Sequence, residues 1–115
     1  MTITRRHLGP RMAQSVVHGD TIYLAGQVAT DTAGGVAGQT ESILGRIDQL
    51  LAECGSDKSK LLSATIYLTD IAAFGEMNGV WEKWVDGKNV PARTTVEAKL
   101  AAPQYLVEIT VIAAR

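Results

Sequence analysis

The sequence feature that most constrains the fold is the C-terminal stretch over residues 91–115, PARTTVEAKLAAPQYLVEITVIAAR. Polar and apolar side chains alternate over residues 93–100 and, less regularly, over residues 106–113. This alternation is typical of half-buried β-strands. We therefore predict a final hairpin of two strands joined by a turn that contains Pro103.

Matching the apolar faces of these two strands sets their register, because a slip by one residue would turn every side chain over. The matched apolar face consists of Val96, Ala98, Leu100, Val107, Ile109, Val111 and Ala113. The opposite face then carries Arg93, Thr95, Glu97, Leu106, Glu108, Thr110 and Ile112. A guanidinium, carboxylates and hydroxyls among aliphatic side chains suit neither a dry core nor a plain solvent surface. The pattern therefore predicts that a site can be built on this second face.

The rest of the chain is divided by turn residues and by changes of hydrophobic period. It has four further predicted strands, at residues 2–7, 13–17, 21–27 and 61–69, with a turn at 18–20. One amphipathic helix is predicted from Gly38 to a stop at Gly55, and a second is capped by Asp70 and closed by Gly87. This order predicts a single α+β domain over residues 1–115, a mixed sheet with two helices packed on one face.

The sheet face that the two helices leave uncovered is not a solvent face. The residues predicted there are weakly polar or apolar, namely Thr65, Tyr67, Leu106 and Ile112. A face of this kind is usually buried against another chain. We therefore predict an obligate homo-oligomer with Arg93 and Glu108 at or near the subunit interface.

The composition of the chain limits which binding partners and which cellular compartment are expected. The net charge of −1 gives no electrostatic reason to expect nucleic acid or an anionic membrane as a partner. One cysteine cannot form an intramolecular disulfide. No stretch approaches the roughly 20 apolar residues of a membrane span, and the first residues lack the apolar segment of a secretion signal. We expect a cytoplasmic protein.

Two charged residues stand out as candidates for chemistry, and each has a structural alternative. Arg93 follows Pro91-Ala92 at the start of a strand, and its planar guanidinium fits a carboxylate with two hydrogen bonds. The alternative is a structural ion pair with Glu97 or Glu108. Glu108 lies mid-strand, where a carboxylate needs a partner. It is therefore a base or water-orienting group, the counter-ion of Arg93, or both.

Other candidates are weaker. Asn78 lies at the border of the apolar stripe of the second predicted helix, where it either caps a neighbouring loop or belongs to a functional site. Gly26, late in a strand, indicates a bulge, a close approach to a ligand, or packing alone. Cys54 is expected to be a buried small hydrophobe. His7 and His18 share no metal-ligand spacing, and no phosphate-binding motif is present, so we expect no metal and no cofactor.

Four stretches together resemble the Rid family of reactive intermediate deaminases, also called the YjgF family. They are Leu24-Ala25-Gly26-Gln27-Val28, Gly55-Ser56 with the strand Ala64–Leu68, Met77-Asn78 with Trp81, and Pro91-Ala92-Arg93 followed fifteen residues later by Glu108. The last is the most specific. The resemblance covers essentially the whole chain and implies a chorismate-mutase-like fold that assembles as a homotrimer with three clefts between subunits.

The resemblance also implies an activity, the hydrolysis of 2-imino or enamine acids such as 2-aminoacrylate to 2-keto acids and ammonia, without a cofactor. Arg93 would then bind the substrate carboxylate, and Glu108 would hold the attacking water. The backbone of Thr95 would accept a hydrogen bond from the imine nitrogen, the amide near Gly26 would help to seat the ligand, and Asn78 would support the cleft.

Two positions depart from the family pattern. Active deaminases of the family often have a cysteine two residues after the arginine, where this chain has Thr95. The family often has an aromatic residue just after Gly-Pro, where this chain has Arg11-Met12. The first change is tolerable if only the main-chain carbonyl is used. The second change removes an aromatic ring that would stack on the substrate, and it would alter the size or charge of the substrate that the site prefers.

Two further functions are compatible with the sequence. One is a non-catalytic binder of small carboxylic acids that uses the same Arg93 site. The other is a ribonuclease or translation inhibitor, a description that some family members carry. The near-neutral charge, the aromatic content of 5% and the lack of a basic stripe argue against nucleic acid.

Overall fold

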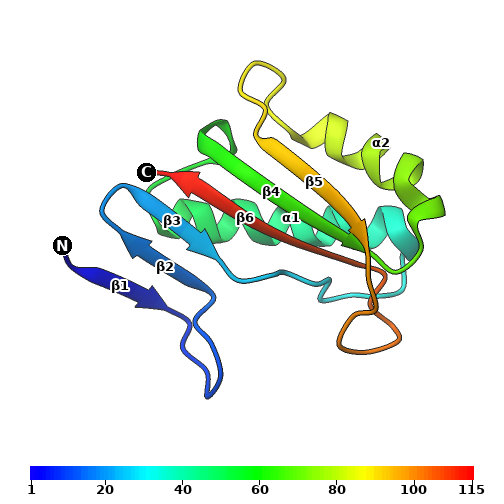
Figure 1. The fold of residues 1–115 in the computed structure, drawn as a ribbon, viewed down its shortest axis with the longest axis horizontal. Helices are drawn as coiled ribbons and strands as arrows, with labels where there is room; N and C mark the ends of the chain where they lie inside the picture. The colour runs from blue at the N-terminus through cyan, green and yellow to red at the C-terminus, as the bar shows by residue number, and fades with distance from the viewer.

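The computed structural model describes residues 1–115 as one sheet with two α-helices on one of its faces (Figure 1). The strands are β1 (Ile3–Arg6), β2 (Ser15–His18), β3 (Thr21–Leu24), β4 (Leu61–Leu68), β5 (Ala92–Glu97) and β6 (Val107–Ala114). The helices are α1 (Gly35–Glu53) and α2 (Phe74–Trp84), with short 3₁₀ turns η1 (Lys58–Lys60) and η2 (Ile71–Ala73). The smallest dimension of 20 Å corresponds to two layers, as predicted for an α+β domain.

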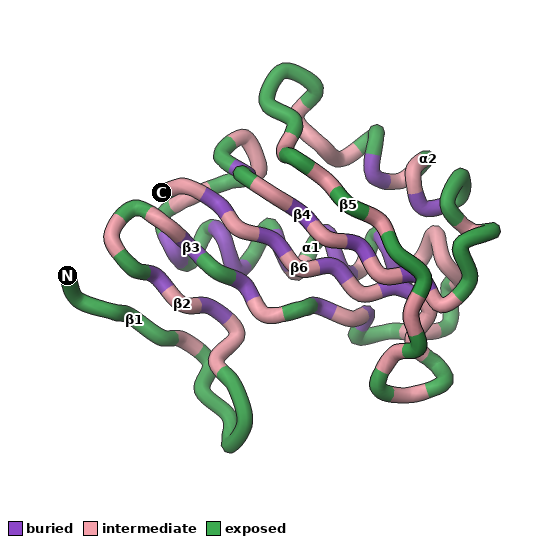
Figure 2. Tube along the Cα trace, in the orientation of Figure 1, coloured by how far each residue is buried: buried purple, intermediate pink, exposed green.

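The core lies between the sheet and the helices. Over residues 63–68 of β4 and along β6 buried and half-buried residues alternate, which Figure 2 shows as alternating purple and pink. The buried set on these two strands includes Ala64, Ile66, Leu68, Val107, Ile109, Val111 and Ala113. Helix α1 adds Ile43, Leu44, Ile47, Leu50 and Leu51, and α2 adds Met77 and Trp81. The helical stripes predicted from spacing are therefore the faces that pack on the sheet.

Glycines lie at both ends of helix α1. The helix begins at Gly35, three residues before the predicted start, because Gly38 N–H already donates to Gly34 O at 3.0 Å. It stops where predicted. Gly55 has φ +75°, which L-residues other than glycine rarely adopt, and Ser56 N–H turns back to Leu51 O at 2.9 Å.

This C-terminal stop gives a prediction about stability. Gly55→Ala should lower the free energy of unfolding by about 1 kcal/mol, through backbone strain alone, since the added methyl has open space. Gly45→Ala, inside α1 and also in open space, should raise it by about 0.5–1 kcal/mol. Urea unfolding of both variants at one protein concentration measures the pair. If both substitutions changed the free energy of unfolding in the same direction, the role given to the positive φ of Gly55 would be contradicted.

The sheet order corrects the predicted C-terminal hairpin. The order is β1-β2-β3-β6-β4-β5, so β4 lies between β5 and β6. Strand β5 pairs with β4 in parallel, whereas β6 runs antiparallel to both β4 and β3. The prediction was wrong because residues close in sequence were assumed to pair, although β5 returns to β4 through helix α2 as a β-α-β unit.

Smaller differences concern the ends of elements. Strand β3 ends at Leu24, and Gln27 contributes only an isolated bridge to Ile109. Asp70 is a cap, as predicted, but of η2, where its Oδ1 accepts from Ala72 N–H at 2.9 Å. Neither helix has the length and apolar content needed to cross a membrane.

Candidate functional site

Arg93 lies on β5, an edge strand, and points to the helix-covered face of the sheet. Its register partner on β4 is Ala64, which is buried on that face. Its Cζ lies 5.7 Å from the centroid of the Phe74 ring and 5.4 Å from that of Trp81. Both distances are within cation–π range. The guanidinium is therefore held at the sheet edge against two rings of α2.

Two buried polar atoms without a hydrogen-bond partner belong to the same region. Phe74, Asn78 and Trp81 lie at i, i+4 and i+7 on one stripe of α2, so Asn78 lies between the two rings that contact Arg93. Its Oδ1 is buried and unpartnered, and so is Oγ1 of Thr95. Thr95 follows Arg93 by two residues and shares its side of the strand. Because buried polar atoms are almost always paired, both remain available to a ligand.

The main chain of Thr95 faces the free edge of the sheet. Ala98 N–H donates to Leu68 O at 2.9 Å, so Ala98 turns its backbone groups toward β4. Successive residues of a strand turn these groups to opposite sides, so Thr94 and Val96 also face β4. Thr95 therefore presents its N–H and C=O outward, where no other strand of the chain pairs with them.

Glu108 and Gly26 form a second group. Glu108 is half-buried on β6, and its side chain lies directly over the Cα of Gly26. A Cβ added at Gly26 would lie 2.9 Å from the carboxyl carbon of Glu108 and closer still to its Oε2. Any residue other than glycine would displace the carboxylate. Among the three roles open to Gly26 in the sequence, the structure shows packing, with the Glu108 side chain as the neighbouring group, and the approach to a ligand stays a prediction.

The two groups lie on opposite faces of the sheet, which corrects the predicted common face. Glu108 pairs with Tyr67 on β4, whereas Arg93 pairs with Ala64, an odd number of residues away along the same strand. Side chains of paired residues share a face, and successive residues alternate. Arg93, Thr95 and Glu97 thus point toward the helices, and Glu108, Thr110 and Ile112 point away. The faces were misassigned because they were matched across a β5–β6 pairing that does not exist.

Leu106 is a further correction. It was predicted on the open face but packs against the core, just before β6 begins. The other residues predicted for the open face, Thr65, Tyr67 and Ile112, are half-buried and lie away from the helices.

The structural ion pairs considered for Arg93 do not form within the chain. Glu97 Oε1 accepts from Ile71 N–H at 3.0 Å and so closes the turn before α2. Glu108 lies on the other face. His7 Nε2 and Glu53 Oε2 form a hydrogen bond of 2.6 Å at the surface, and no arginine or lysine lies within salt-bridge distance of a carboxylate. The guanidinium of Arg93 therefore has no carboxylate partner in its own chain.

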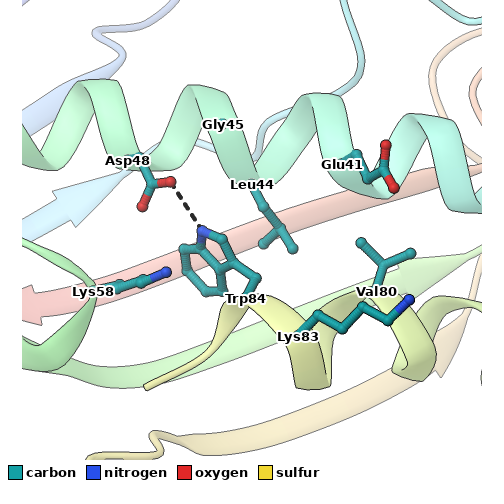
Figure 3. Close-up of a pocket in the computed structure, with 8 residues that line it drawn as sticks. All are labelled: Glu41, Leu44, Gly45, Asp48, Lys58, Val80, Lys83 and Trp84. Atoms are coloured by element: carbon teal, nitrogen blue, oxygen red, sulfur yellow. Dashed lines mark hydrogen bonds between the residues drawn. The ribbon is translucent and has the colours of Figure 1, made fainter. Parts of the chain in front are cut away.

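A hollow between the two helices lies away from these residues. The groove between α1 and α2 has a volume of about 350 Å³. Figure 3 shows Leu44 and Val80 among the residues that line it. Trp84 Nε1–H donates to Asp48 Oδ2 at 3.0 Å across it, and Lys58 Nζ lies 5.4 Å from the Trp84 ring. None of the predicted site residues lines this groove. Hydrogen bonding across this groove joins the two helices, and the candidate site is the edge of β5.

Sequence reasoning missed the contribution of Phe74 and Trp81 to the surroundings of Arg93. Both were assigned to the apolar stripe of α2, which is correct for Trp81, 5% exposed, but not for Phe74, 41% exposed. The signal was present, since both rings lie one turn from Asn78 on the same helix face. Cys54 is buried, as predicted, and its Sγ accepts from Arg6 Nη1 at 3.7 Å.

The Met12 position lies on an exposed loop. Met12 follows Gly9-Pro10 in the loop between β1 and β2, and its side chain is 53% exposed. Gly9 N–H donates to Met12 O at 2.8 Å, which closes a tight turn. An apolar side chain at this tip is thus available to a neighbouring surface rather than to the core of its own chain.

These features define a class: a two-layer α+β protein with an unpaired guanidinium at the edge of a mixed sheet. The family model described as Endoribonuclease L-PSP matches residues 9–115. The chain belongs to this family, the YjgF/RidA family, as the resemblance predicted.

Individual relatives agree over the full length. A RutC family protein from Haemophilus influenzae is 45% identical over 114 residues, 98% of each chain. The RutC family protein YoaB from Escherichia coli is 40% identical over 99% of each. Among solved structures, NMB1025, a YjgF family member from Neisseria meningitidis, is 43% identical with a TM-score of 0.97, covering 100% of this chain and 96% of that one.

Proposed function

We propose that the protein hydrolyses reactive 2-imino and enamine acids, such as 2-aminoacrylate, to 2-keto acids and ammonia, in clefts between the subunits of a homotrimer. The observation that supports this most directly is the guanidinium of Arg93, fixed at a sheet edge without a carboxylate partner. A guanidinium presents a planar fork that a substrate carboxylate fits with two hydrogen bonds.

The placement of Glu108 is the reason for proposing a site shared between copies. Arg93 and Glu108 lie on opposite faces of one sheet, so a single chain cannot direct both at one small molecule. A second copy packed on the open face, over Thr65, Tyr67 and Ile112, would bring its Arg93 edge toward Glu108 of the first. Assembly would thus complete the site as well as bury that face.

The reaction follows from the chemistry of the imine. An enamine acid first gains a proton from water at C3 and becomes the iminium. The iminium carbon is already electrophilic, so water can add to it once the substrate is oriented. The water oxygen bonds to that carbon while Glu108 takes one of its protons, a general-base step typically worth 10²–10⁴-fold. Glu108 then returns this proton to the nitrogen of the carbinolamine. As the C–N bond breaks, the hydroxyl group gives its proton back to the Glu108 carboxylate, so that ammonia leaves and a 2-keto acid remains.

The remaining residues in the proposed site would orient the substrate. The carbonyl of Thr95, which faces the free edge, would accept from the imine N–H. Asn78 Oδ1 and Thr95 Oγ1, both buried and unpartnered, would provide further polar contacts beside the carboxylate. Thr95 in place of the common cysteine is compatible with this arrangement because its main chain carries the interaction. Gly26 would leave room for the carboxylate of Glu108. The backbone amide near Gly26 would help to seat the ligand.

A coupled assay tests the proposal. An amino-acid oxidase or dehydratase generates the imine in place, the purified protein is added, and semicarbazide traps the imine that remains. A fall in semicarbazone that depends on Arg93 supports the deaminase. If semicarbazone stays constant while pyruvate still binds through Arg93, the protein is a binder of small carboxylic acids instead.

The close approach of Glu108 to Gly26 gives a further prediction. Gly26→Ala should slow imine hydrolysis about tenfold or more, because the new methyl displaces the carboxylate. Stability should change little, since the atoms that move are the end of a flexible side chain. Comparing kcat with the midpoint of urea unfolding measures the two effects. An unchanged kcat would remove Glu108 from the reaction.

A further inference from the structure

The surroundings of Arg93 carry an inference about how the site is kept ready for its ligand. We infer that Phe74 and Trp81 are positioning residues, which hold the Arg93 guanidinium by cation–π contact in the geometry that receives the substrate carboxylate. This inference rests on the proposed function for the nature of the ligand, and on the contacts of this chain for the mechanism of positioning.

The first step is that Arg93 has no other group to fix it. Arginine side chains have many rotamers, and ordering one costs entropy. Usually a carboxylate or a set of carbonyl groups offsets this cost. Here the nearby carboxylate of Glu97 is bonded to Ile71 N–H, and Glu108 is on the other face. The contacts identified for the guanidinium are the two rings, at 5.7 and 5.4 Å.

The second step is that one of these rings is itself rigidly held. Trp81 is 5% exposed, and its ring centroid lies 5.4 Å from that of Trp84 at an interplanar angle of 52°. Trp84 is anchored in turn through its Nε1–H to Asp48 of α1. The Trp81 ring is thus a fixed support behind the guanidinium, joined to the core and to the neighbouring helix.

The third step concerns Phe74, which lies on the outer side. It is 41% exposed, although a phenylalanine at the start of a helix could easily be buried. Its position one turn before Asn78 brings it over the same guanidinium. An exposed ring contributes little to the core, so the contact with Arg93 is a reason for an aromatic side chain at this position.

Positioning by aromatic rings has a functional advantage over positioning by a carboxylate. A carboxylate partner would neutralise the guanidinium and would have to be displaced by the substrate. The faces of aromatic rings leave the edge of the guanidinium, with its N–H donors, free. The cation is then ordered before the ligand arrives, which lowers the entropy that binding must overcome.

The test is Phe74→Leu, with Phe74→Tyr as its matched control. Leucine keeps apolar bulk but removes the π face, whereas tyrosine restores it. For Phe74→Leu we expect KM for the imine and the Kd for pyruvate to rise together by about 3- to 20-fold. The Arg93 Nε–H signal in NMR spectra, assigned by its loss in Arg93→Ala, should move away from its ring-current-shifted position. Phe74→Tyr should recover most of both changes.

Phe74 is exposed enough that Phe74→Leu should fold, and Trp81→Phe provides a second variant with a smaller ring at the buried position. Unchanged pyruvate affinity and an unchanged Arg93 signal in Phe74→Leu would overturn the inference even if the wild type deaminates imines. A wild type without deaminase activity, whose pyruvate affinity still depends on Phe74, would reject the proposed reaction but retain the positioning role.

Discussion

Arg93→Ala is expected to lower kcat/KM for imine hydrolysis by about 100-fold or more. The guanidinium is the cation placed to form two charge-assisted hydrogen bonds with the substrate carboxylate, and each such bond contributes about 1.5–3 kcal/mol. At 1.4 kcal/mol for each factor of ten, losing both removes at least two orders of magnitude. The semicarbazide assay measures the loss, and the oligomeric state is checked by light scattering.

Two comparisons make this result specific. Arg46→Ala removes the same charge from α1, where the Arg46 side chain donates to Gln49 Oε1, and it should leave turnover unchanged. Arg93→Lys keeps the charge but loses the fork, so its activity should lie between those of the alanine variant and the wild type. Full activity of Arg93→Ala on 2-aminoacrylate would show that the assigned site is wrong.

Glu108→Gln is expected to reduce kcat by about 10²-fold while the Kd for pyruvate changes by less than about threefold. Glutamine has nearly the same shape but cannot take a proton from water, so the loss should fall on the chemical step. Single-turnover kinetics together with calorimetric titration of pyruvate separates turnover from binding.

The matched control is Glu82→Gln, an equivalent change at an exposed position of α2, which should leave both quantities unchanged. Equal losses in kcat and in pyruvate affinity for Glu108→Gln would show that the charge of Glu108 has a structural role and not a catalytic one. In that case the acceptor for the water proton would have to be sought among the groups contributed by a second copy.

The sequence was informative wherever a local pattern determines structure. The helical stripe from Ile43 to Leu51 and the alternation over β4 predicted which side chains are buried, because period and burial are properties of one element at a time. Arg93 and Glu108 were singled out by residue type and spacing in the same way.

The errors concern which elements are neighbours. No property of residues 91–115 alone reveals that β4 separates β5 from β6, because that arrangement depends on helix α2 returning the chain parallel to β4. The wrong partner then placed Arg93 and Glu108 on one face. The contact of Arg93 with Phe74 also depends on how α2 lies over the sheet edge, which spacing within a helix does not determine.

The central place of β6 has a consequence for how the chain reaches its native state. Strands β1 to β3 form an antiparallel unit and β4 and β5 form a parallel pair, yet the two parts of the sheet are joined only through β6. During synthesis β6 is made after all the other strands. Until it leaves the ribosome, β3 and β4 both present unpaired edges, the kind of surface that favours aggregation. The sheet can therefore be completed only after its other five strands have been made, and chaperones that shield strand edges would act on this chain until β6 is in place.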